Sequence, residues 1–171
     1  MARYSVAFPN MTTGAGVADT TALTDLQHIS IQGGSATQQI RINEVQCGGE
    51  ASSAAVQNMV LGRSAVVAVT AVTSVGMGMA AMDGTTTAPT AALFSNASTT
   101  KSQRLAVASA GHLLRQSFNA FGGLVRWQAR QGEEITTIGA SANFGEVNYS
   151  AGNGAGQTSS QVSTHIIMEI V

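Results

Sequence analysis

The chain has 171 residues and a formal net charge of −1, and 10% of its residues are charged, against about 25% in ordinary soluble proteins. This length suits one domain with a sizeable core, and the charge excludes a basic surface for nucleic acid or anionic lipid. Because so few charges protect a monomer from association, we expect partners, including further copies of the chain, to cover much of its surface.

Residues 1–26 contain few apolar side chains and are expected to form an N-terminal arm or a loosely packed first strand. The opening stretch MARYSVAFPN has no apolar segment of a secretory signal, which indicates synthesis in a cytoplasm. Residues 27–171 are expected to form one domain. Its only cysteine, Cys47, permits no intrachain disulfide and is predicted to be buried.

Short strands follow the arm. The first is predicted at 28–32, and the stretch QQIRINEVQC at 38–47 alternates apolar and polar residues as a half-buried strand does. The alternation then changes parity, which predicts a β-bulge near Glu44. Gly48-Gly49 is expected to turn the chain into the next strand, at 54–63.

The stretch SAVVAVTAVTSVGMGMAAM at 64–82 has no charged residue and is nearly long enough to cross a bilayer as a helix. It contains no Leu, Ile or Phe, however, and its glycines interrupt any helix. The β-branched first half instead predicts a strand at about 65–72. We therefore expect no membrane segment here.

A long uncharged loop is expected at about 73–93. It carries Met77, Met79 and Met82, whose flexible thioethers can pack against irregular surfaces. These three residues are the candidate interface with another subunit or with a shell beneath. The alternative is that they fold back over the domain's own core.

The second half of the chain again shows short strand patterns with turn residues between them. Around Leu113, Leu114 and Phe118 the sequence could instead form a short helix. Together the patterns predict eight or nine short antiparallel strands, in a sandwich or a barrel. The strands are expected at 103–109, 123–129, 134–139, 144–150 and 162–171.

The last strand is apolar on both faces towards its end. Val162, Thr164, Ile166, Met168 and Ile170 share one face. Such a strand is a poor solvent-exposed edge, so we expect it in the centre of a sheet or against another subunit.

Catalytic and metal-binding patterns are missing from the sequence. The histidines His28, His112 and His165 lie far from other ligands, and Glu133-Glu134 is expected to form surface ion pairs with Arg126 and Arg130. Trp127 is expected to pack in the core. We expect no enzyme, no cofactor and no metal, although calcium bound by carbonyl and Asn oxygens would leave no sequence signature.

Three stretches resemble small structural proteins of tailed bacteriophage virions: IQGGSATQQIRINEVQCGGEASSAAVQNMVLGR (31–63), VRWQARQGEEI (125–135) and the terminal HIIMEIV. The resemblance implies a jelly-roll β-sandwich, commonly trimeric, that decorates or reinforces a capsid or belongs to an appendage. It implies a homotrimer bound to the major capsid protein or other virion proteins. No catalytic residue is carried over.

Two other classes stay open at this stage. A receptor- or carbohydrate-binding jelly-roll module of a tail or fibre would need aromatic residues on exposed loops, and aromatics make up only 5% of the chain. A cupin-like enzyme would need several histidines and a glutamate close together. A head decoration protein, located in the virion, is the expectation that the sequence favours.

Overall fold

The computed structural model describes residues 2–12, 29–32, 37–63, 79–85, 93–96, 113–137, 147–153 and 161–171. Within these ranges the chain forms eleven strands and no helix. Neighbouring strands pair antiparallel throughout. The expected all-β antiparallel fold is therefore confirmed. The strands outnumber the predicted eight or nine because short strands of two to four residues are added to the sheets.

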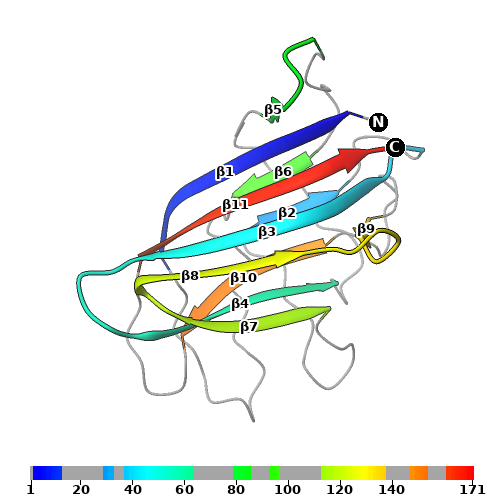
Figure 1. Cartoon of the computed structure of the whole chain (residues 1–171). Coiled ribbons are helices and arrows are strands. Elements are labelled where there is room, and N and C mark those ends of the chain that lie inside the picture. The colour runs from blue at the N-terminus through cyan, green and yellow to red at the C-terminus, as the bar shows by residue number, and fades with distance from the viewer. Residues whose placement is uncertain are drawn as a thin grey trace.

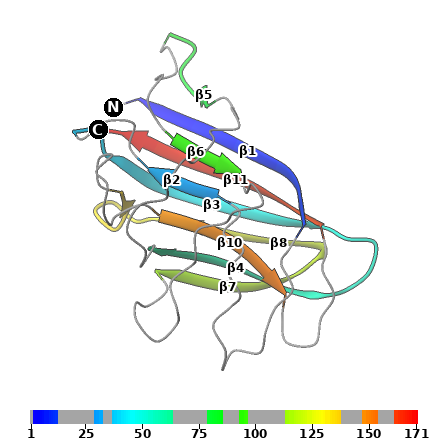
Figure 2. The ribbon, with the colours of Figure 1, turned by 180° about the vertical axis from the view of Figure 1, so that it is seen from behind.

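The strands form two layers (Figures 1 and 2). The front sheet has the order β5-β1-β11-β3-β8, with β9 also paired to β3, and the back sheet has the order β6-β2-β10-β4-β7. The front strands are β5 (Ala80–Ala81), β1 (Arg3–Thr12), β11 (Gln161–Ile170), β3 (Ile40–Glu50), β8 (Phe121–Gln128) and β9 (Ile135–Thr136). The back strands are β6 (Leu93–Asn96), β2 (Ile29–Gln32), β10 (Val147–Asn153), β4 (Val56–Arg63) and β7 (Leu114–Asn119).

The strand order is that of a jelly roll. Among the eight strands β1, β2, β3, β4, β7, β8, β10 and β11, every connection in chain order changes sheet except that from β4 to β7. The first strand thereby pairs with the last, and eight strands form the two four-stranded halves β1-β11-β3-β8 and β2-β10-β4-β7. Both ends of the described chain lie at one end of the sandwich (Figure 1).

The core lies between the sheets and receives large apolar side chains from both. Fully buried side chains come from the front strands β1, β3 and β11 and from the back strands β2 and β4. Burying each large apolar side chain contributes roughly 1.5–3 kcal/mol. The largest apolar members are Ile31, Ile40, Ile42, Met59, Leu61, Ile166, Met168 and Val6.

The terminal strand occupies the place that its pattern predicts. β11 lies between β1 and β3 in the centre of the front sheet. Its residues Val162, Thr164, Ile166 and Met168 are buried, whereas the residues that alternate with them, from Ser163 to Glu169, are half-buried. The predicted central strand is confirmed. β1 pairs with β11, and its residues Tyr4 and Val6 are buried.

The predicted bulge near Glu44 is confirmed. Across the β3–β11 pair, Glu44 faces Ile167 and Ile42 faces Met168, so Asn43 is the extra residue on β3. The bulge lets Ile42 and Val45 both reach the core despite their opposite parity.

The expected turn at Gly48-Gly49 is wrong, because β3 continues through both glycines to Glu50. The chain leaves the front sheet after Glu50 and enters β4 at Val56. Gly49 instead allows a close approach of two backbones: a Cβ at this position would lie 2.0 Å from the carbonyl oxygen of Ala120. The N–H of Ala51 donates to that same oxygen at 3.0 Å, which ties the two connections between the sheets together.

Other expected elements differ or lie outside the described residues. The short helix considered around Leu113–Phe118 is wrong: residues 114–119 form β7, paired with β4, with half-buried or buried side chains at every second position. The segment expected as an uncharged loop at 73–93 contains the charged Asp83, the short strand β5 and the beginning of β6. The strands expected at 65–72 and 103–109 lie outside the described residues.

Candidate functional site

The outer face of the front sheet, which points away from the core, carries rows of polar side chains from successive strands. No labelled strand lies over this face (Figure 1). One row runs from Ala7 on β1 through His165 on β11 and Gln46 on β3 to Arg126 on β8. Directly paired residues place their Cβ atoms about 4.5–5.5 Å apart. The register therefore brings residues that are far apart in the sequence into contact.

A second row alternates in charge. Arg3 on β1 faces Glu169 on β11, and Glu169 faces Arg41 on β3. The Arg3 Nε donates to Glu169 Oε1 at 3.0 Å. One glutamate is thus flanked by two arginines, and only Arg3 is hydrogen-bonded to it among the described residues.

A two-point ion pair on this face joins Arg126 on β8 and Glu44 on β3. The guanidinium donates through Nε to Oε1 at 2.7 Å and through Nη2 to Oε2 at 2.9 Å. Gln46 also donates to Oε1 of Glu44. These hydrogen bonds, with that from Arg126 first, lower the pKa of Glu44 although burial of the carboxylate opposes the shift. The expected pairing of Arg126 with Glu133-Glu134 is wrong, because the β3–β8 register offers it Glu44.

The connection between β8 and β9 forms one wall beside these pairs. Gly132 adopts a positive φ of 86°, and its N–H donates to Glu134 Oε1 at 3.0 Å. The pKa of Glu134 lies below its ordinary value because its own backbone N–H and that of Gly132 donate to the carboxylate, with the charge of Arg41 acting in the same direction. The loop therefore holds a carboxylate close enough to Arg41 for their charges to interact.

These elements enclose a hollow of about 840 Å³, which we call the charged hollow. Three arginines and three glutamates line it, in a chain with only eight Lys and Arg and nine Asp and Glu. Met82 and Ile167 add apolar surface. The charged members are Arg3, Arg41, Arg126, Glu44, Glu134 and Glu169.

The other end of the same face is apolar. Leu124 on β8 is 67% exposed and lies over Gly48, where an added Cβ would be 3.8 Å from its Cδ1 atom. Together with Ala7 and His165 it lines a shallow hollow of about 280 Å³. Phe121, at the start of β8, is 60% exposed. A large exposed leucine and phenylalanine thus lie on the same strand as Arg126 of the ion pair.

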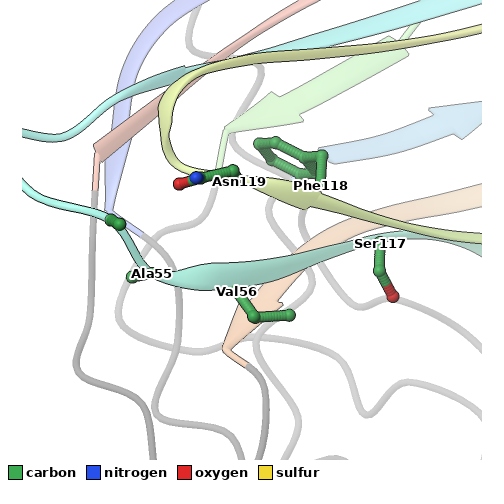
Figure 3. Close-up of a pocket in the computed structure, with 6 residues that line it drawn as sticks. Ala55, Val56, Ser117, Phe118 and Asn119 are labelled. Atoms are coloured by element: carbon green, nitrogen blue, oxygen red, sulfur yellow. The ribbon is translucent and has the colours of Figure 1, made fainter.

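A third hollow, of about 340 Å³, lies where β4 begins and β7 ends (Figure 3). Phe118 and Ser117 leave β7 on opposite sides, and Val56 points away from the phenyl ring. Phe118 is buried, whereas Val56 is 50% exposed. This hollow offers apolar contact and few polar groups.

The three candidate interface methionines have different surroundings. Met82 is 56% exposed and lines the charged hollow, next to β5. Met79 is partly buried and packs against the core. Met77 lies outside the described residues. The structure therefore brings Met82 together with the charged side chains of the hollow, an association that no sequence pattern indicated.

The cysteine, the tryptophan and one histidine singled out in the sequence lie within the described residues. Cys47 is fully buried and Trp127 packs against the core, as predicted. His165 is half-buried on the outer face, whereas His28 and His112 lie outside the described residues. No group of three or more His, Cys, Asp or Glu residues in the described ranges is arranged to hold a metal ion.

Sequence reasoning missed the charged hollow. Its members come from β1, β3, β8 and β11 and from the β8–β9 loop, and only the pairing register makes them neighbours. The one sequence signal that could have indicated the hollow was the polar face of β3, where Arg41 alternates with buried isoleucines.

Comparison with known proteins adds no assignment: no protein-family model and no curated protein matches the chain. None of the described segments is a helix long and apolar enough to span a membrane.

Proposed function

We propose that the chain is a non-enzymatic structural subunit of a bacteriophage virion, a head decoration protein that binds and stabilises the capsid shell as an oligomer, most simply a homotrimer. The observation that carries the proposal is the outer face of the front sheet. It joins an apolar end, with Leu124 and Phe121 exposed, to a charged end whose carboxylates already bear hydrogen bonds. The jelly-roll strand order, which capsid proteins also use, and the sequence resemblance support the same class.

The charge distribution suits a surface that becomes covered. Glu44 is almost completely buried, and its charge is balanced by a two-point bond to Arg126. Charges that are already paired cost less to bury against another subunit than free ones. The exposed apolar side chains supply the hydrophobic part of such a contact, at about 25 cal/mol per Å² of apolar area removed from water.

The test uses shells of the phage that carries this chain, prepared without it, and purified chain added back. We expect saturable binding by sedimentation, and a jelly roll on the shell by electron microscopy with the front sheet in contact. Leu124→Glu places a charge in the apolar end and is expected to weaken binding at least tenfold. Leu113→Glu, at an exposed leucine outside the two front-sheet hollows, is the matched control.

Absence of binding by the unmodified chain would contradict the proposed function. Equal loss of binding in the Leu124→Glu and Leu113→Glu variants would mean that the front sheet is not the surface that contacts the shell. Both variants must first show the melting temperature of the unmodified chain, so that a folding defect is not read as a binding defect.

A further inference from the structure

One arginine of the charged hollow is not hydrogen-bonded to any of its carboxylates. Its three glutamates all accept hydrogen bonds: Glu44 from Arg126, Glu169 from Arg3, and Glu134 from the backbone of Gly132. Among the described residues the side chain of Arg41 has no hydrogen bond or salt bridge, although a guanidinium offers five N–H donors. The guanidinium donors of Arg41 are therefore left to a ligand, and Asn43 Oδ1, a buried acceptor of the lining without a partner among the described residues, is available beside them.

Arg41 has glutamates on two sides and a backbone fixed by the sheet. Glu169 faces it directly across the β3–β11 pair, and Glu134 lies close enough for Arg41 to lower its pKa. Its backbone is fixed between β11 and β9, since it also pairs with Thr136. Its guanidinium is a planar fork that matches a carboxylate with two parallel hydrogen bonds.

We propose that the charged hollow is a docking site for an acidic side chain of a protein partner, with Arg41 binding the carboxylate and Met82 contacting an apolar residue beside it. Met82 is exposed and lines the same hollow, together with the half-buried Ile167. The ligand is thus a short segment in which Asp or Glu is adjacent to an apolar residue. This inference rests on the proposed function, because it names the partner chemistry for one end of the contact surface.

The charge balance of the hollow favours one carboxylate over a polyanion. Three arginines face three glutamates, so the formal charge of the lining is zero. A nucleic acid needs an excess of positive charge along its phosphates, and this hollow does not supply it. A single carboxylate needs only the donors of Arg41.

The test is a titration of the isotopically labelled full chain with the pentapeptide acetyl-Ala-Leu-Glu-Leu-Ala-amide, followed by NMR of the arginine Nε–H signals. The signal of Arg41 is assigned as the one lost in the Arg41→Lys variant. We expect the peptide to shift this signal, and the peptide with Gln in place of Glu to bind at least tenfold more weakly. Arg41→Gln should abolish binding, judged by backbone signals around the hollow, whereas Arg130→Gln, an exposed arginine outside the lining, should preserve it.

Equal binding of the two peptides, retained binding in Arg41→Gln, or no shift with either peptide would overturn the inference. So would a larger shift of the Arg41 signal with a short single-stranded DNA than with the acidic peptide. The proposed function has a separate readout. If Arg41→Gln fails to alter peptide binding while the chain still assembles on shells, only the docking site is wrong.

Discussion

Glu44 and Arg126 are 82 residues apart in the sequence and lie diagonally across the β3–β8 pair, where they form a two-point ion pair of 2.7 and 2.9 Å. The side chain of Glu44 is 7% exposed, and that of Arg126 is 55% exposed. The arginine therefore covers the carboxylate and stays in contact with solvent. This pair fixes the centre of the outer face that we propose as the contact surface.

Removal of the Glu44 charge should destabilise the fold in a pH-dependent manner. The native pKa of Glu44 lies below its ordinary value of 4.5, so its contribution is fully present above pH 4.5 and is lost as the pH falls through the native pKa. We expect Glu44→Gln to lower the free energy of unfolding at pH 7, and the difference from the unmodified chain to shrink towards pH 3. Urea denaturation at both pH values measures it. If Glu44→Gln lowers the free energy of unfolding by the same amount at both pH values, the carboxylate does not have the assigned role.

The two faces of β11 should respond differently to truncation. Ile166 is fully buried between the sheets, and Ile167 is half-buried on the outer face. Ile166→Ala should lower the free energy of unfolding by about 2–5 kcal/mol, as removal of a large core side chain does. Ile167→Ala should cost clearly less. Denaturation curves for both variants measure the contrast, and a larger loss for Ile167→Ala would mean that the register of β11 is wrong.

The adjacent glycines of β3 offer a second contrast. A Cβ at Gly49 would lie 2.0 Å from the backbone oxygen of Ala120, whereas a Cβ at Gly48 would meet only Leu124, at 3.8 Å. Gly49→Ala should therefore destabilise the chain by about 1–3 kcal/mol, the usual cost of forcing extra atoms into a packed region. Gly48→Ala should be nearly neutral. Thermal unfolding of the two variants measures this, and similar melting temperatures would refute the close approach at Gly49.

Met79 and Met82 should separate folding from association. Met79 packs against the core and Met82 is exposed at the charged hollow. We expect Met79→Ser to lower the melting temperature, and Met82→Ser to leave it unchanged while weakening association or shell attachment. The triple variant Met77→Ser, Met79→Ser, Met82→Ser should weaken attachment well above tenfold. If Met82→Ser leaves both properties unchanged, this residue is not part of an interface.

The fold was predictable from local patterns, whereas the charged hollow was not. Alternating residues in β3 and β11 indicated which side chains enter the core, and the parity change before Val45 located the bulge. The glycine pair at 48–49 led to the wrong prediction of a turn, because glycine also permits a close contact between two backbones. The neighbours of Arg41 depend on the pairing of β3 with β11 and β9, which no local pattern contains.

The size of the chain in solution tests the central claim most directly. Light scattering on the full chain at micromolar concentration is expected to give an oligomer, with a mass of about three times 17.4 kDa for the proposed trimer. The reason is the combination of 10% charged residues with exposed Leu124, Phe121 and Met82 on or beside one face. A stable, fully folded monomer of the unmodified chain at this concentration would contradict the account.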